Sequence, residues 1–139
     1  MAKIKTLEML RKLYVSPKGR ALSKELTVLE RHSKTFIKLS PFVLIGTSSE
    51  NGDGDVSPRG ENPGFVKVID DNTIIIPDRP GNNRLDTLTN IVENSSVGLL
   101  FLIPGIDETL RINGKAEIRD DINLLKKCEV NEKPPKSVI

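Results

Sequence analysis

The run Val97-Gly98-Leu99-Leu100-Phe101-Leu102-Ile103 is continuously apolar, and it decides the fold class of this chain. Pro104-Gly105 ends the run with a turn, so the run has the length of a single strand. A strand without polar alternation is typical of a central position in a sheet, where both faces are buried. We therefore expect a sheet that has this strand near its middle.

Five further strand patterns surround this run, and turns alone separate most of them. They cover residues 42–47, 55–57, 65–69, 73–76 and 110–118, and Ser49-Glu50-Asn51-Gly52-Asp53-Gly54 is a hairpin turn between the first two. Strands joined by turns pair antiparallel, whereas a parallel sheet needs a helix at each crossover, and only one such helix is visible. Closing the sheet removes its edges. The sequence therefore predicts a mainly β fold, a small barrel of six or more antiparallel strands.

Helical patterns lie at both ends of the chain and once in its middle. Apolar residues recur every three to four positions over 4–14 and again over 22–37, and Ser40-Pro41 ends the second stripe. A short helix follows Asn82-Asn83 over 85–92, and Asp120 or Asp121 caps a last one. We expect one domain over residues 1–139, in which residues 1–40 form a helical N-terminal extension.

Composition excludes several classes of function. The chain has 139 residues, a net charge of +2, no Trp and few other aromatic residues, which disfavours nucleic-acid binding. No apolar run reaches membrane-spanning length and no signal peptide is visible, so we expect no membrane partner. The single cysteine, Cys128, fits a reducing cytoplasm. The single histidine, His32, lies on the second helical stripe, where we expect it to be partly exposed, so a zinc site or a serine triad has little support.

Four arginines lie at turns instead of on a helix face. Arg59 follows Ser57-Pro58, Arg79 and Arg84 lie in Pro77-Asp78-Arg79-Pro80-Gly81-Asn82-Asn83-Arg84, and Arg111 follows Glu108-Thr109-Leu110. Glycine lets a backbone amide approach a ligand, proline fixes the loop, and the arginine fork grips phosphate oxygens. The helix that opens at Asn82-Asn83 adds an anion site. This pattern predicts a ligand with a phosphate group; the alternative is solvated arginines in surface ion pairs.

Other motifs are incomplete. The acidic turn at 51–55 begins like a calcium loop but has Val56 and Asn62 where that loop needs Gly and Glu. No glycine-rich dinucleotide motif follows a strand, and no Walker loop is present. We assign no metal site and no catalytic residue.

Five segments carry a specific family resemblance. They are Asp55-Val56-Ser57-Pro58-Arg59-Gly60, Pro63-Gly64-Phe65-Val66, Ile76-Pro77-Asp78-Arg79-Pro80-Gly81-Asn82-Asn83-Arg84-Leu85-Asp86, Val97-Gly98-Leu99-Leu100-Phe101-Leu102 and Glu108-Thr109-Leu110-Arg111-Ile112-Asn113-Gly114. Together with Ser40-Pro41-Phe42 they resemble the signature of the pyridoxamine 5'-phosphate oxidase-like flavoproteins, more narrowly a bacterial branch of FMN-dependent enzymes. The resemblance covers nearly the whole chain.

The resemblance implies a split β-barrel that binds FMN without a covalent link, usually as a homodimer with the flavin sites at the interface. Asn82, Asn83 and Arg84 occupy the place of the family's Ser-Arg-Lys phosphate motif, which makes Arg84 a phosphate ligand. The resemblance places Ser57 and Arg59 near the phosphate and the ribityl chain, and Thr109 and Arg111 where a strand reaches the flavin across the dimer interface. The resemblance also implies that Ile76, Pro77 and Asp78 border the flavin. The implied cofactor-binding residues are Ser57, Arg59, Pro77, Asp78, Arg79, Asn82, Asn83, Arg84, Thr109 and Arg111.

Two departures from the family bear on function. Asn-Asn-Arg has one cation fewer than Ser-Arg-Lys, a loss for which Arg59 or Arg79 could compensate. Family members usually continue past residues 136–139 into a segment that supplies substrate-binding residues in the true oxidases, so we expect a C-terminal end that is truncated relative to the family. We therefore expect an FMN-dependent oxidoreductase that acts on an unknown small molecule. The alternative is a non-catalytic carrier or sensor that holds flavin or another cofactor.

Overall fold

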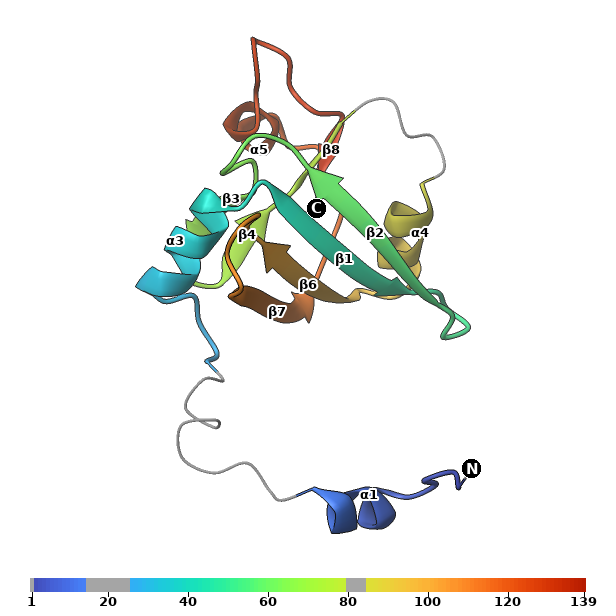
Figure 1. The fold of residues 1–139 in the computed structure, drawn as a ribbon. Coiled ribbons are helices and arrows are strands. Elements are labelled where there is room, and N and C mark those ends of the chain that lie inside the picture. The colour runs from blue at the N-terminus through green and yellow to red at the C-terminus, as the bar shows by residue number, and fades with distance from the viewer. Residues whose placement is uncertain (1, 15–25, 80–84) are drawn as a thin grey trace.

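The structure is a computed structural model that describes residues 2–14, 26–79 and 85–139. Figure 1 shows the order of its elements along the chain. The strands are β1 (Phe42–Ser48), β2 (Gly54–Gly60), β3 (Lys67–Asp70), β4 (Thr73–Ile75), β5 (Pro77–Asp78), β6 (Ser96–Leu102), β7 (Thr109–Lys115) and β8 (Ser137–Val138). The helices are α1 (Leu7–Leu13), α3 (Arg31–Leu39), α4 (Asp86–Glu93) and α5 (Ile122–Lys127).

Antiparallel pairing joins the strands into a split β-barrel, as the sequence predicted. The strands β2, β1, β6 and β7 form a four-stranded sheet in that order, β3 pairs with β4, and β5 pairs with β8. The hairpin turn between β1 and β2 contains Gly52 at a φ of 86°, a conformation that glycine adopts without strain. The strands β5 and β8 are only two residues long, and β5 lies inside the Ile76–Asp86 string quoted above.

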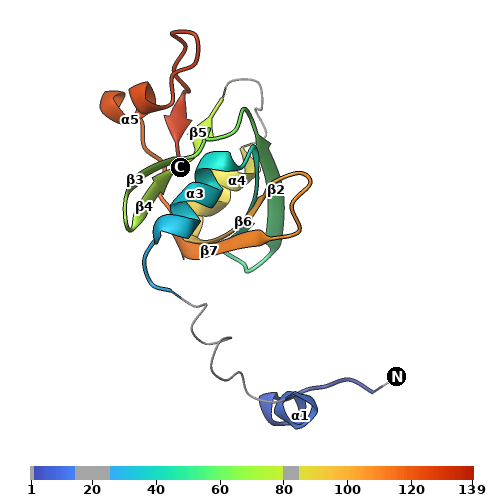
Figure 2. The same cartoon turned by 60° about the vertical axis from the view of Figure 1, so that its left-hand side comes forward.

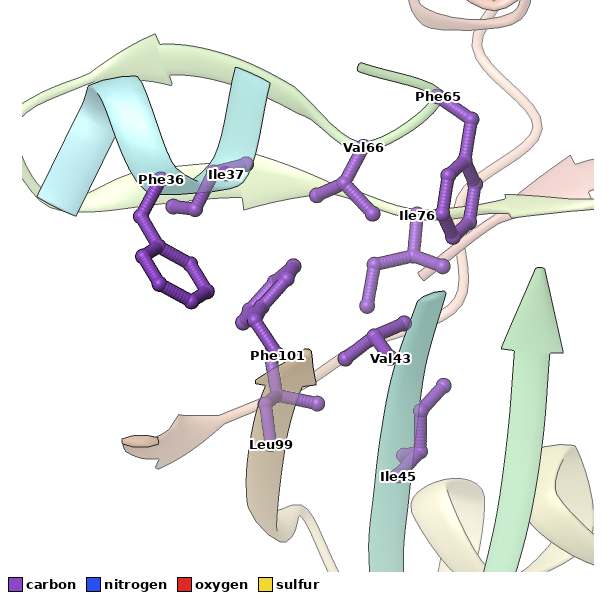
Figure 3. Close-up of a cluster of buried hydrophobic side chains, with 9 residues drawn as sticks. All are labelled: Phe36, Ile37, Val43, Ile45, Phe65, Val66, Ile76, Leu99 and Phe101. Atoms are coloured by element: carbon purple, nitrogen blue, oxygen red, sulfur yellow. The ribbon is translucent and has the colours of Figure 1, made fainter. Parts of the chain in front are cut away.

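The barrel core lies between the inner face of the four-stranded sheet and the segments that cross it (Figure 3). β1 and β6 contribute alternate residues, among them Val43, Ile45 and Phe101, all of them fully buried. Figure 2 shows α3 lying across one end of the barrel, into which it inserts Phe36 and Ile37. Burying each such side chain stabilises the fold by roughly 1.5–3 kcal/mol.

The strand β6 is central, as predicted, but it is not buried on both faces. It lies between β1 and β7. On its inner face Leu99 and Phe101 are buried, whereas Leu100 and Leu102 on its outer face are only half-buried. No element in the described part of the chain covers that outer face fully. The apolar run therefore supplies core side chains on the inner face of the sheet and an apolar surface on its outer face.

Helices lie where the sequence predicted them, except at the start of α3. Asp121 occupies the N-cap position of α5, but its side chain makes no cap hydrogen bond, so that part of the prediction was wrong. The second helical stripe was expected to begin at residue 22, but residues 26–30 are not helical and α3 begins at Arg31. The backbone N–H of Leu29 donates to Asp71 O at 2.7 Å, and the Leu29 side chain packs against the core, which holds this segment away from helical geometry. α1 buries none of its residues and lies away from the barrel in Figures 1 and 2.

Candidate functional site

Strand alternation in β2 places three polar side chains on the inner face of the sheet. Cross-strand pairing sets Asp55 opposite Thr47, Ser57 opposite Ile45, and Arg59 opposite Val43. Since paired residues share a face, these three point toward the barrel interior, while the β2 residues between them point outward. As β2 is an edge strand of the sheet, its polar inner face borders a cavity instead of the apolar core.

That cavity has a volume of about 220 Å³, and we call it the phosphate pocket after the ligand that the sequence predicts. Strand β2 forms one wall, Asp78 of β5 forms another, and the first turn of α4 closes it. Its lining consists of Asp55, Val56, Ser57, Arg59, Asp78, Leu85, Asp86, Thr87 and Leu88. Arg59 and Asp78 form an ion pair inside it, with side chains only 16% and 11% exposed. The pocket thus combines a largely buried guanidinium, carboxylates and hydroxyls within the reach of one small polar ligand.

The start of α4 faces this pocket without a side-chain cap. Its N-cap, Leu85, has a φ of 60° and no side-chain acceptor, and no side-chain cap hydrogen bond is present among the described residues. A non-glycine residue in this left-handed region is uncommon. Uncapped amides at a helix N-terminus carry partial positive charge and favour an anion. Asn90 holds α4 in place, because its Nδ2 donates to Thr47 Oγ1 of β1 at 3.0 Å.

Arg79 points away from the phosphate pocket. Its Nε lies 3.2 and 3.1 Å from the two carboxylate oxygens of Glu61, and its Nη2 lies 3.1 Å from Glu61 Oε1. The same Nη2 donates to Cys128 O at 2.6 Å. This guanidinium borders a different hollow, of about 250 Å³, near Phe65 and Cys128. The structure therefore separates two of the arginines that the sequence grouped together.

Thr109 and Arg111 lie on the opposite face of the four-stranded sheet from Ser57 and Arg59. Register pairs Leu102 with Thr109 and Leu100 with Arg111, so both residues share the outer face and both are exposed. They also lie on β7, the far edge strand, three strand spacings of roughly 4.8 Å each from β2. Within one chain they do not join the phosphate pocket.

Of the remaining predicted residues, one lies in β5 next to the pocket lining and three lie in a segment that the structure does not describe. Pro77 is buried in β5, beside Asp78. Asn82, Asn83 and Arg84 lie outside the described residues, directly before Leu85. The sequence reading missed Asp55 and Thr87. Two-residue alternation along β2 could have found Asp55, because it shares the parity of Ser57 and Arg59; Thr87 could not have been placed without the packing of α4.

A larger hollow, of about 1010 Å³, lies elsewhere in the structure. Its walls include Ile45, Val97 and Leu99, and its cations are Lys115 and Arg119. Lys115 Nζ donates to Ser96 Oγ at 2.7 Å, and hydrogen bonds to Glu117 and Asp121 raise the pKa of Arg119. Among the described residues, no group of three His, Cys, Asp or Glu side chains converges as metal ligands. Over the same ranges no helix has the length and apolarity needed to cross a membrane.

Comparison with known proteins agrees with this fold. The sequence model of the family described as pyridoxamine 5'-phosphate oxidase matches residues 29–139. The chain belongs to the pyridoxamine 5'-phosphate oxidase family. The match contains every residue of the phosphate pocket and both residues of β7 named above. A search of curated proteins found no match.

Solved structures share the fold of this family member at low sequence identity. HupZ from Group A Streptococcus has 20% identity and a TM-score of 0.61, over 79% of this chain and 85% of that chain. A candidate pyridoxamine 5'-phosphate oxidase from Lactobacillus delbrueckii has 19% identity and a TM-score of 0.62, over 82% of this chain and 88% of that chain. At such identities the likeness establishes the fold alone.

Proposed function

We propose that this protein is an FMN-binding flavoprotein that acts as an oxidoreductase on a small molecule in the cytoplasm, as a homodimer. The observation that carries the proposal is the phosphate pocket, where Arg59, Ser57 and the uncapped start of α4 converge. Guanidinium groups and helix N-termini both bind phosphate in proteins. Membership of the pyridoxamine 5'-phosphate oxidase family supports flavin as the bearer of that phosphate.

The pocket fits one end of FMN and not the whole molecule. Its volume of about 220 Å³ is below the roughly 300–1,000 Å³ of pockets that enclose a complete ligand. Arg59, Ser57 and Arg84 would hold the phosphate, the last on the strength of sequence alone. Asp78 and Thr87 would bond hydroxyls of the ribityl chain, because a carboxylate accepts and a hydroxyl both donates and accepts. The bound flavin would accept a hydride or two electrons, and the protein would supply placement and electrostatics.

A second copy of the chain would complete the site. Thr109 and Arg111 lie on the outer sheet face and on the strand farthest from β2, so only a partner could bring them to the flavin ring. Apolar residues cross that outer face in register, with Pro58, Leu44 and Leu100 in one row that ends at Arg111. Exposing such a face to water is unfavourable, whereas burying it against a matching face is favourable. We propose that this surface is the dimer interface.

A flavin titration tests this proposal directly. The purified protein should bind FMN with the visible absorption of a flavoprotein and should quench FMN fluorescence with saturation. Riboflavin, which lacks the phosphate, should bind at least about tenfold more weakly, because charge-assisted bonds contribute roughly 1.5–3 kcal/mol each. A colourless protein that takes up neither FMN nor riboflavin would rule the proposal out.

A carrier or sensor without turnover is the second candidate. Among the described residues that line the phosphate pocket, the titratable ones are Asp55, Arg59, Asp78 and Asp86, and none is a histidine, cysteine or lysine. The pocket thus offers little for proton transfer near neutral pH. Stopped-flow mixing with NADH and NADPH separates the two candidates: an enzyme should show rapid bleaching of the flavin, whereas flavin that no donor reduces would favour the carrier.

A further inference from the structure

Asp78, the last residue of β5, and Arg79, which follows it, point to opposite sides of the chain. Asp78 turns into the phosphate pocket and pairs with Arg59. Arg79 turns the other way and pairs with Glu61, which follows β2. Arg59 and Glu61 are two residues apart, so the same two segments are joined twice, by ion pairs of opposite polarity.

The Arg79 contact is a specific, partly buried one. Three hydrogen bonds of 3.1–3.2 Å link its guanidinium to the Glu61 carboxylate, and the two side chains are 27% and 25% exposed. Two backbone carbonyls complete the arrangement, Cys128 O at 2.6 Å and Lys133 O at 3.4 Å. The guanidinium therefore binds three segments to one another: the end of β2, the exit of β5, and the turn after α5. A planar fork with this many partners is held in one orientation.

These contacts leave Arg79 poorly placed as a ligand of the phosphate pocket. Its donors are directed at Glu61 and at carbonyls of the 128–133 segment, and it does not line that pocket. Its backbone, however, adjoins Asp78. A backbone displacement at Arg79 would therefore also displace the carboxylate that pairs with Arg59.

We propose that Arg79 is a positioning residue: with Glu61 it holds β5 against β2, and so keeps Asp78 and Arg59 in the geometry that binds the phosphate of FMN. This inference rests on the proposed function and names a role for a residue that does not touch the ligand. The β5–β8 pairing, in which Asp78 lies opposite Ser137, supports β5 from its other side. The Glu61 contact is the second ion pair, beside Arg59–Asp78, that joins β5 and its exit to β2 and the residue after it.

Glu61→Gln tests the proposal, because Glu61 lies outside the phosphate pocket. The substitution keeps the shape of the side chain and removes its charge. If Arg79 is a positioning residue, FMN binding should weaken about tenfold, which corresponds to 1.4 kcal/mol, while riboflavin binding should change little. The ratio of the two dissociation constants is the decisive readout, since general destabilisation would weaken both ligands alike. Glu61→Asp, which keeps the charge on a shorter side chain, should fall between wild type and Glu61→Gln.

Glu117→Gln is the matched control. It removes a carboxylate from Arg119 in an exposed ion pair away from the phosphate pocket, so both flavins should bind as they do to the wild type. If Arg79 were itself a phosphate ligand, Glu61→Gln would release it and leave FMN binding equal or tighter, which would overturn the positioning role alone. A wild-type protein that binds no flavin would overturn the proposed function and this inference with it.

Discussion

The Arg59 guanidinium on β2 forms an ion pair with the Asp78 carboxylate on β5, and both side chains are largely buried. The residue predicted to grip a phosphate therefore already has a carboxylate partner. A guanidinium carries five N–H donors, so pairing through Nη1 does not exhaust its capacity. Arg59 can hold the barrel together through Asp78 and still donate to a ligand in the pocket.

Removing Arg59 should destabilise the fold as well as weaken FMN binding. Arg59→Ala leaves the Asp78 carboxylate largely buried without its cation, and we expect the free energy of unfolding to fall by roughly 3 kcal/mol. Urea unfolding of the ligand-free protein measures this change. Replacing both partners with apolar residues of similar size, Arg59→Met with Asp78→Leu, should recover most of the loss, because no charge is then left unpaired.

The exposed pair of Lys34 and Asp71 provides the comparison for that experiment. Its side chains are 39% and 65% exposed, and exposed pairs contribute at most about 1 kcal/mol. Lys34→Ala should therefore shift the unfolding midpoint much less than Arg59→Ala. Equal losses of unfolding free energy in the two variants would mean that burial of the Arg59–Asp78 pair does not increase its contribution to stability.

A charge on the outer sheet face should dissociate the proposed dimer. Leu100 is half-buried in the middle of that face and pairs in register with Leu44 and Arg111. Leu100→Asp places a carboxylate where two apolar faces meet, and burying that charge is strongly unfavourable even with Arg111 as its cross-strand neighbour. Sedimentation velocity should show a monomer, and FMN affinity should fall because the partner's contribution is lost.

Val92→Asp provides the control for the dimer experiment. Val92 is 76% exposed on α4, away from the outer sheet face, so its substitution should leave both the dimer and FMN binding intact. Circular dichroism of both variants should show the same secondary structure. A dimer that persists in Leu100→Asp would place the interface elsewhere.

The thiol of Cys128 should be unreactive in the folded protein. Burial raises its pKa above the usual range, although the nearby Arg79 acts in the opposite direction, and the residue is 2% exposed. Because the folded pKa exceeds the unfolded value of about 8.5, unfolding favours the thiolate, so this group's contribution to stability is full below that pH and is lost as the pH rises through the folded pKa.

Iodoacetamide labelling and urea unfolding check this expectation. Labelling at pH 8 should be slow until urea unfolds the protein. The free energy of unfolding should decline more steeply above pH 8.5 in the wild type than in Cys128→Ala, which has no thiol to titrate. Rapid labelling of the folded protein would contradict the buried position of Cys128.

The sequence predicted the barrel well, because turns and strand periodicity are local signals. The hairpin at Gly52 and the apolar run that became β6 were both recognisable from neighbouring residues alone. The start of α3 was wrong because its cause is not local. A hydrogen bond from Leu29 to Asp71, 42 residues later in the chain, keeps residues 26–30 out of the helix.

The site was also predictable only in part, because some of its signals are local in sequence and others depend on tertiary packing. Loop arginines flanked by Gly and Pro could be recognised in sequence, but the direction of each guanidinium depends on tertiary partners. Arg59 and Arg79 look alike in sequence, and only packing shows that one meets Asp78 inside the phosphate pocket while the other meets Glu61 outside it.

Arg84 provides the sharpest test of the phosphate prediction. It directly precedes Leu85, the residue before α4, and lies outside the described residues, so this expectation comes from sequence. Arg84→Ala should weaken FMN binding at least about tenfold, because a charge-assisted bond contributes roughly 1.5–3 kcal/mol. Riboflavin binding should hardly change. Arg84→Lys should lie between, since it keeps the charge and loses the fork.

Arg31→Ala provides the matched control for Arg84→Ala, because Arg31 is an exposed arginine in the first turn of α3 and does not line the phosphate pocket. It should bind both flavins as the wild type does. Fluorescence titration of all four proteins with FMN and with riboflavin gives the two affinities that matter. Equal FMN affinity in wild type and Arg84→Ala would make Arg84 a solvated residue, and would leave Arg59 and the start of α4 as the groups that hold the phosphate.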